Sequence, residues 1–268
     1  MMIFLSISKG YMEKVKKVEF KEYKSSAKEL LDSIGFDKRL KSIKKIAIKP
    51  NLLDTEGPPC TTDVKCIDAI IEYIRGVNPD SEIFIIEGSG GCKTKKAFEV
   101  LGYYELGKKH DIDVIDVDDC KLKTLKRDDT RVYKEIFLPE KIFESFLISV
   151  PCLKDHMITT VTLGFKNLIG FLPKKHYGQY WHYNRSDVHR VGVDNAIYDL
   201  SKYIDIGLVV IDGRIGQQGS HLPGGRSCDP AKNILIAGYD CLEVDKVGSG
   251  ILGHSWEDVT HLSMIANH

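Results

Sequence analysis

Apolar residues along this chain fall into short strand-like runs separated by stretches with helical spacing. The run at 82–87 is nearly continuous, which is typical of a strand buried on both faces of a parallel sheet. After Asp63, a residue type that often caps a helix N-terminus, Ile67, Ile70 and Ile74 recur at helical spacing. Strands are predicted at 14–20, 43–49, 82–87, 113–117, 132–138, 146–150, 207–212 and 233–237.

Helices are predicted between most of these strands. One covers about 26–34, with Ser26 and Glu29 at capping-box spacing, and others begin near Asp63, Thr94 and Val191. Strands that alternate with helices predict an α/β, Rossmann-like fold, with a mostly parallel sheet and helices on both faces. The 268 residues suit one domain, 1–268, and an arrangement of two lobes, 14–148 and 149–268, is left open.

Polar residues and glycines follow four of the predicted strands. Ligands of such sheets bind beyond the carboxyl ends of the strands, where the strand order reverses, so these residues are predicted to share one cleft. The strand at 146–150 stops at Pro151, which lacks a backbone N–H, and a polar segment follows it. The candidate residues, in chain order, are Lys49, Asn51, Thr62, Gly88, Ser89, Gly90, Lys154, His156, Lys166, Asn167, Asp212 and Gly213.

Amines and an imidazole among these residues indicate proton transfer or anion binding. Lys166 lies in a segment, 161–172, that is otherwise mostly apolar, so its amine needs a partner or a function there. We expect Lys154, His156 and Lys166 to be catalytic and the other candidates to bind substrate. The loop at 88–91 could offer backbone N–H groups to a phosphate or carboxylate, although a tight strand-to-helix turn explains it equally well.

Charge and cysteine content narrow the range of functions. Lys plus Arg and Asp plus Glu number 38 each, so a general nucleic-acid binder is not expected. The seven cysteines form no C-x-x-C pair, which argues against an iron–sulfur or zinc-ribbon module and favours reduced thiols in the cytoplasm. The apolar start lacks the features of a signal peptide and is too short to span a membrane, so no membrane association is expected. No metal ligand set is predicted, the cofactor stays unknown, and a homo-oligomer is left open.

Two loops carry further signals. The glycine-rich segment 213–225 is either a lid over the cleft or an irregular connection. Aromatic residues alternate with basic ones at 174–185, a pattern that suits either base stacking or the covering of a small ligand.

Several short motifs together resemble a known family. They are Lys49-Pro50-Asn51, Thr61-Thr62-Asp63, Gly88-Ser89-Gly90, Pro151-x-x-Lys154-x-His156 and Gly164-x-Lys166-Asn167-x-x-Gly170. This set is similar to the prokaryotic family called domain of unknown function 362, over about 15–262 of the chain. The resemblance implies no agreed activity, and the ferredoxin-like cysteine segment that many members carry is missing here. The strand–Pro–Lys–His layout is also distantly similar to the nickel-pincer lactate racemase family.

These observations lead to a hypothesis and one alternative. The hypothesis is a cytoplasmic enzyme that acts on a small anionic metabolite by proton transfer at a Lys/His site, as an isomerase, lyase or transferase. The alternative is a redox-partner module that binds a cofactor or metal, through Cys60, Cys92, Cys152 or the histidines, without catalysis of its own.

Overall fold

A ten-stranded sheet forms the centre of the protein, whose computed structural model describes residues 15–178 and 185–267. Five neighbouring strands run parallel, and two antiparallel strands complete one edge. The mostly parallel α/β sheet predicted from the sequence is therefore confirmed. The parallel strands, in spatial order, are β4 (Asp113–Asp116), β3 (Glu82–Glu87), β2 (Lys45–Pro50), β7 (Phe146–Val150) and β10 (Leu208–Gln218), followed by the antiparallel β12 (Ile234–Gly238) and β1 (Val15–Glu19).

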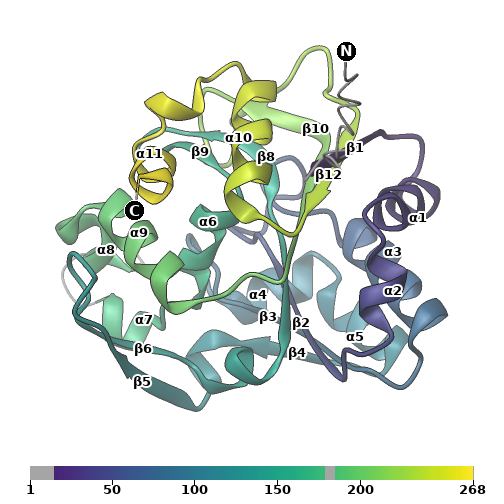
Figure 1. The fold of residues 1–268 in the computed structure, drawn as a ribbon, viewed down its shortest axis with the longest axis horizontal. Coiled ribbons are helices and arrows are strands. Elements are labelled where there is room, and N and C mark those ends of the chain that lie inside the picture. Colours follow the sequence, from purple (N-terminus) through teal and green to yellow (C-terminus); the bar gives the residue numbers. More distant parts are fainter. Residues whose placement is uncertain (1–14, 179–184, 268) are drawn as a thin grey trace, which may run out of the picture.

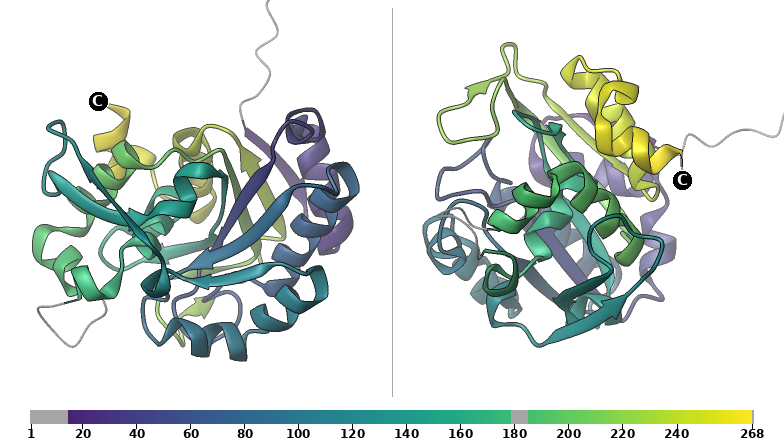
Figure 2. Two further views of the ribbon diagram at one scale, coloured as in Figure 1. Left: turned by 90° about the horizontal axis from the view of Figure 1, so that it is seen from below. Right: turned by 90° about the vertical axis from the view of Figure 1, so that its left-hand side faces the viewer.

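Helices cover both faces of the sheet (Figures 1 and 2). One face is covered by α1 (Tyr23–Ser33), α2 (Phe36–Leu40), α3 (Val64–Val77), α4 (Thr94–Val100) and α5 (Tyr103–His110). The other face is covered by α6 (Gly164–Asn167), α7 (Lys174–Tyr177), α8 (Ser186–Val191), α9 (Val193–Tyr203), α10 (Cys241–Leu252) and α11 (Thr260–Ala266). Strands of the two segments considered as lobes, 14–148 and 149–268, pair within this one sheet.

Alternation along the central strands builds a core on each face. In β3, Ile83 and Ile85 pack under α1 to α5, whereas Phe84 and Ile86 face the opposite core. Successive side chains of a strand point to opposite faces, so a strand with helices on both sides needs apolar residues at consecutive positions. This is why the run at 82–87 has no polar alternation.

The strand order reverses beside β2. The chain passes from β2 to β3 and β4 on one side, then returns to place β7 on the other side of β2. Loops after β2 and β7 therefore diverge at this point, which is where ligands of parallel sheets usually bind.

Pro151 interrupts the strand pairing but does not end it. After this residue, β8 (Cys152–His156) continues beside the long β10, and β9 (Thr160–Thr162) pairs back onto β8. The segment with Lys154 and His156 is thus a strand and not a loop.

Other elements differ modestly from their predicted limits. Helix α1 begins at Tyr23, and the Glu22 carboxylate accepts a hydrogen bond from the N–H of Ser25, so the capping box predicted at Ser26 and Glu29 is wrong. Ser26 is buried within the helix. The cap at Asp63 is confirmed.

Smaller elements are the hairpin β5 (Leu122–Lys126) and β6 (Glu135–Pro139), strand β11 (Arg226–Ser227), and the 3-10 turns η1 (Val117–Asp119), η2 (Glu140–Glu144), η3 (Leu168–Phe171) and η4 (Trp256–Asp258).

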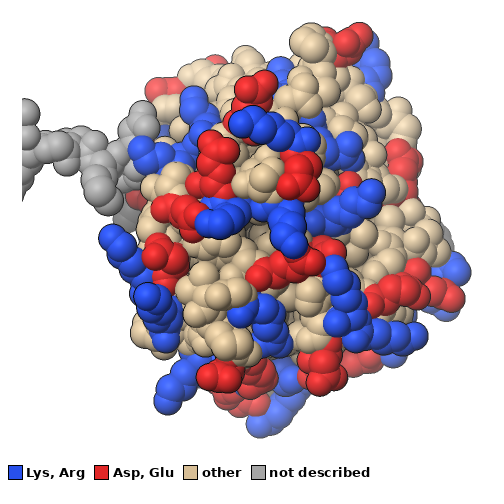
Figure 3. Space-filling model, turned by 90° about the vertical axis from the view of Figure 1, so that its right-hand side faces the viewer, with Lys and Arg blue, Asp and Glu red and all other residues tan. Residues whose placement is uncertain are grey.

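The face formed by α1, α3 and α5 carries charges of both signs. Figure 3 shows Lys and Arg interspersed with Asp and Glu, and ion pairs such as Lys24–Glu72 (3.1 Å) and Lys109–Asp68 (2.6 Å) link neighbouring helices. In the described part of the chain, no helix has the length and apolar character needed to cross a bilayer.

We expect Asp199→Ala to lower the free energy of unfolding by about 2–3 kcal/mol, because three backbone N–H groups lose their acceptor, that of Tyr133 buried and those of Arg131 and Val132 partly buried. The buried Asp199 carboxylate in α9 accepts hydrogen bonds from the N–H groups of Arg131, Val132 and Tyr133, at 2.7, 2.8 and 2.7 Å. Urea unfolding measures the effect. The exposed Asp205, changed to Ala, is the control and should shift stability by less than about 0.5 kcal/mol. Equal effects of the two substitutions would contradict this account of the 131–133 turn.

Candidate functional site

A pocket of about 570 Å³ opens at the carboxyl ends of four adjacent parallel strands. Segments that follow β2, β3, β7 and β10 all contribute to its wall, together with α6, η3, α8 and α9. The described residues that line it are Leu53, Gly90, Gly91, His156, Ile158, Lys166, Ile169, Arg185, Val188, His189, Val193, His221 and Leu222. The pocket therefore occupies the edge of the sheet that the sequence indicated.

Lys166 is held at the pocket by the short helix α6. The first two N–H groups of this segment, on Gly164 and Phe165, donate to the buried carboxylate of Asp245 in α10, at 2.7 and 2.9 Å. A Cβ on Gly164 would lie 2.9 Å from that carboxylate, so only glycine allows so close an approach. The Asp245 contacts thus fix the orientation from which the Lys166 side chain reaches the pocket.

The amine of Lys166 has no hydrogen-bond or ion-pair partner among residues 15–178 and 185–267. Burial, with the nearby cations Lys154, Arg185 and Lys49, lowers the pKa of Lys166 to about 7. At neutral pH the side chain is consequently divided between amine and ammonium. A lysine of this kind can both accept a proton and bind an anion.

His156 carries its ring proton on the nitrogen that is free of the backbone. Its Nδ1 accepts hydrogen bonds from the N–H groups of Ile158 and Thr159, at 3.1 and 3.2 Å, so Nδ1 is unprotonated and the neutral ring bears its proton on Nε2. Burial and Lys166 hold the pKa of His156 far below its usual range. His156 is therefore a hydrogen-bond donor through Nε2.

A second imidazole lies against the first. His221, from the loop after β10, stacks on His156 with the ring centroids 3.6 Å apart. Burial and Lys166 lower the pKa of His221 to about 4, and the same two causes lower the pKa of His189 in α8. The two stacked rings are neutral at physiological pH, because burial and the nearby Lys166 both oppose their protonation.

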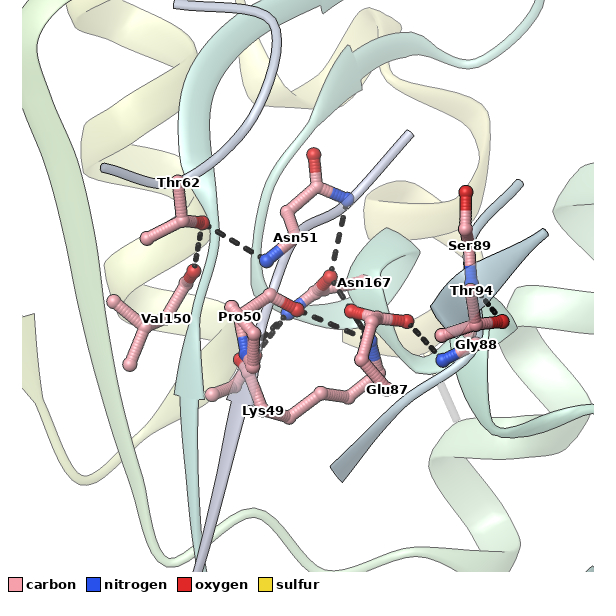
Figure 4. Close-up of polar contacts among 12 residues, drawn as sticks. Lys49, Pro50, Asn51, Thr62, Glu87, Gly88, Ser89, Thr94, Val150 and Asn167 are labelled. Atoms are coloured by element: carbon pink, nitrogen blue, oxygen red, sulfur yellow. Dashed lines mark hydrogen bonds and ion pairs between the residues drawn. The ribbon is translucent and has the colours of Figure 1, made fainter. Parts of the chain in front are cut away.

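A buried ion pair lies beneath the pocket (Figure 4). The Nζ of Lys49, at the end of β2, is 2.6 Å from a carboxylate oxygen of Glu87, at the end of β3, and both side chains are almost fully buried. Burial lowers the pKa of Lys49 and raises that of Glu87, and their mutual attraction opposes both shifts. The pair ties two adjacent strand ends together.

Asn167 joins this pair to β7 and to the loop after β2. Its Oδ1 accepts from Lys49 Nζ (3.3 Å) and from Asn51 Nδ2 (3.2 Å), and its Nδ2 donates to Ser149 Oγ (3.0 Å). Thr62 completes the connection, because its hydroxyl accepts from the N–H of Asn51 and donates to the carbonyl of Val150 (Figure 4). Lys49, Asn51, Thr62 and Asn167 thus form the base of the site and do not line its cavity.

Two glycines allow the surrounding loops to approach this base. A Cβ on Gly170 would lie 2.2 Å from Glu87 Oε1 and 2.4 Å from Lys49 Nζ. A Cβ on Gly88 would lie 2.3 Å from the guanidinium of Arg185. That buried guanidinium donates four hydrogen bonds to backbone carbonyls, those of Leu172, Ser89, Gly88 and Gly170, and so joins the loop after β3 to η3.

The loop at 88–91 has no free amide to offer an anion. The N–H of Gly88 donates to Glu87 Oε1 (2.7 Å), that of Ser89 to Thr94 Oγ1 (3.2 Å), and those of Gly90 and Gly91 to the carbonyls of Leu52 (3.3 Å) and Leu53 (2.6 Å). Every one of these donors already has a protein acceptor. These hydrogen bonds are those of a tight strand-to-helix turn, which was the alternative to anion binding in the sequence analysis of this loop.

Three predicted residues lie away from the pocket. The buried Lys154 Nζ donates to the carbonyl of Cys60 at 2.6 Å. Asp212 accepts a hydrogen bond from the hydroxyl of Tyr23 in α1 at 3.0 Å, and its neighbour Gly213 continues β10. The pocket and its base therefore bring together seven of the twelve candidate residues. Gly88 and Ser89 lie in the adjoining loop, and Lys154, Asp212 and Gly213 do not line the pocket.

Four residues of the site were not predicted. Glu87 ends a buried strand, where a carboxylate requires a cation, and this is a signal that the sequence does contain. Arg185 and His221 come from segments that the sequence marked only as a basic-aromatic stretch and a glycine-rich loop, and His189 lies in α8, just beyond the first of them. Of that basic-aromatic stretch, residues 179–184 lie outside the described residues.

The potential metal ligands among the described residues are not gathered in one place. Within 15–178 and 185–267, no three His, Cys, Asp or Glu side chains are grouped to hold an ion. Burial raises the pKa of Cys152 to about 12 and also raises those of Cys60 and Cys92, so these thiols are protonated at neutral pH. The described residues therefore give no support to the metal-binding alternative.

Comparison with known proteins agrees with the motifs. The sequence profile of the family described as "Domain of unknown function (DUF362)" matches residues 46–250. The chain belongs to this family. The match covers the pocket, its base and the Asp245 contact to α6.

Two known proteins are similar over most of the chain. The "Thylakoid-associated protein sll1697" of Synechocystis sp. (strain ATCC 27184 / PCC 6803 / Kazusa) is 25% identical over 234 residues, which cover 85% of this chain and 69% of that protein. The structure of the lactate racemase apoprotein from Thermoanaerobacterium thermosaccharolyticum superposes with a TM-score of 0.54 at 11% identity, over 90% of this chain and 56% of that one. The chain thus spans little more than half of the racemase, and the likeness concerns the fold.

We expect Lys49→Met to lower the free energy of unfolding by about 3–5 kcal/mol, because it leaves the Glu87 carboxyl buried without its cation. The double variant Lys49→Met/Glu87→Leu should be less destabilised, since it removes both charges. Urea unfolding of the single and double variants measures the coupling. Lys96→Met is the matched control, because Lys96 and Glu99 form an exposed pair at 3.0 Å, and the expected change is below about 0.5 kcal/mol. If the losses in free energy of unfolding from the single substitutions Lys49→Met and Glu87→Leu simply add up in the double variant, the two side chains do not stabilise each other.

Proposed function

We propose that the protein is an enzyme that binds a small anionic metabolite in the pocket and transfers a proton through Lys166. One observation carries the proposal: an amine with a pKa of about 7 reaches the pocket without a partner among the described residues. An amine on a half-buried side chain, surrounded by other cations and without a counter-charge, is favoured as an ammonium ion when the ligand supplies that charge.

The charge of the pocket supports an anionic ligand. Its described lining contains Lys166, Arg185 and three histidines, and no Asp or Glu. Since Arg185 is committed to backbone carbonyls, Lys166 and the Nε2–H of His156 are the donors best placed to hold a carboxylate. The lactate racemase with the same fold acts, by its name, on a small carboxylate, which is consistent with this class of ligand.

The proposed chemistry divides the roles of Lys166 and His156. As an ammonium ion Lys166 binds the carboxylate. In the neutral fraction, populated near its pKa of about 7, the Nε2–H of His156 keeps the carboxylate in place while Lys166 accepts a proton from the metabolite, becomes an ammonium ion, and returns the proton to the same or another atom. His156 donates a hydrogen bond from Nε2 to the oxygen on which negative charge develops. His156 was expected from the sequence to move a proton itself, whereas its Nδ1 contacts favour the donor role. Isomerase, lyase and transferase reactions all accommodate such a step.

Location and assembly stay predictions. A cytoplasmic location was expected from the cysteine content, whereas one relative is named for its association with thylakoids. Self-association and the two-lobe alternative also stay open proposals.

We expect the affinity for a small carboxylate to fall about tenfold between about pH 6 and pH 8, because Lys166 loses its charge as the pH rises through its pKa. The direction follows from the pKa of about 7, below which the ammonium predominates. The stacked histidines stay neutral in this range, so they do not obscure the titration. Calorimetry with a panel of small carboxylates, lactate included, measures the affinity.

Two variants control this experiment. Lys166→Arg keeps its charge throughout and should give a nearly flat profile, whereas Lys166→Met should bind weakly at every pH. A pH dependence that persists unchanged in Lys166→Met would remove Lys166 from the proposal.

We expect the wild-type protein, in deuterated water, to introduce deuterium into a bound substrate, since a proton held by a lysine exchanges with solvent. Mass spectrometry of the recovered carboxylates detects the label. Lys166→Met should lose the exchange by a factor of at least about 100, the usual range for a general base. Lys154→Met is the comparison, because the Lys154 amine donates to the Cys60 carbonyl and does not line the pocket. This variant should keep the exchange, although the loss of a nearby cation should raise the pKa of Lys166. Loss of exchange in Lys154→Met, but not in Lys166→Met, would reverse the assignment.

A further inference from the structure

The pocket lining combines two chemically different sets of side chains. The set that can hold a charge, named the polar wall, is Lys166, His156 and His221. The other set, named the apolar wall, is Leu53, Ile158, Ile169, Val188, Val193 and Leu222. A ligand that fills the pocket therefore contacts both polar and apolar side chains.

Exposed apolar side chains surround the pocket mouth. The described large hydrophobic residues with high exposure are Val100, Met157, Ile158 and Leu222, at 51%, 67%, 54% and 45%. Ile158 and Leu222 line the pocket, and Met157 is next to Ile158, with its sulfur 3.7 Å from the hydroxyl of Ser220 in the facing loop. Three of these four residues thus meet where the turn after β8 approaches the loop after β10, and apolar surface gathered at one place marks a binding site.

The cavity is also too large for a very small acid. A three-carbon hydroxy acid has about six non-hydrogen atoms, which at about 30 Å³ each, the share of a water molecule in the liquid, occupy about 180 Å³. That is about a third of the 570 Å³ available. The remaining volume is available to a larger ligand.

A phosphate group does not suit the polar wall. Phosphate sites usually add several backbone N–H groups or the planar fork of an arginine to any lysine that they contain. Here the amides of 88–91 all have acceptors, and Arg185 donates to four carbonyls. One lysine and one imidazole N–H match the single charge of a carboxylate.

We propose that the natural ligand is a monocarboxylate with an apolar tail, its carboxylate on Lys166 and His156 and its tail along the Leu53–Ile169–Val193 side of the pocket. This inference rests on the proposed function for the place of the carboxylate, and it adds the chemical class of the rest of the molecule. A tail of about four to eight carbons fits a cavity of this size class.

Calorimetry with acetate, butanoate, hexanoate and octanoate tests the tail. Affinity should rise about fourfold for each added methylene that reaches the apolar wall. Leu222→Ser and Ile158→Ser should weaken octanoate binding about three- to tenfold and leave acetate unchanged. These residues are exposed, so the variants should fold, and Val100→Ser, an equally exposed residue of α4, is the matched control that should change neither ligand.

The results separate this inference from the proposed function. Lys166→Met should weaken all four carboxylates by a similar factor and preserve the dependence on chain length. Equal affinity for acetate and octanoate, with both weakened by Lys166→Met, would overturn the apolar tail and leave the proposed function standing. Equal binding of octanol and octanoate, unaffected by Lys166→Met, would overturn the carboxylate and the proposed function together. Leu222→Ser and Ile158→Ser without effect on octanoate would overturn the placement of the tail.

Discussion

The buried ion pair between Lys49 and Glu87 is the contact on which the site depends. Two charges removed from water are stable only with a good partner and further hydrogen bonds. Glu87 has both in Lys49 and the N–H of Gly88, and Lys49 adds Asn167. The pair fixes the ends of β2 and β3 relative to each other and supports the segment that carries Lys166.

The positive charge of this region is balanced unevenly. Lys49 has a carboxylate and Arg185 has four carbonyls, whereas Lys166 has neither among the described residues. The neighbouring cations also disfavour the ammonium form of Lys166 and lower its pKa. The same arrangement therefore builds a stable base and leaves one reactive amine at the pocket.

The family relationship and the physical description complement each other. Membership of a family of unknown function assigns no reaction, and the racemase likeness at 11% identity concerns the fold. Fold alone does not determine activity, since one fold carries many chemistries. The reaction class proposed here comes instead from the state of Lys166, the tautomer of His156 and the absence of carboxylates from the described lining.

The sequence by itself determined the order of the main strands and helices, the mostly parallel sheet and the edge at which the pocket opens. These follow from local patterns, such as the continuous apolar run at 82–87 and the polar residues after each strand. Only the tertiary structure decided which polar residues meet. Glu87 pairs with Lys49 across 38 positions, Asp245 reaches Gly164 across 81, and Lys154 turns to Cys60 instead of the pocket. The reason is physical: hydrophobic periodicity reports which face of an element is buried, whereas the partner of a buried charge depends on contacts between elements far apart in the chain.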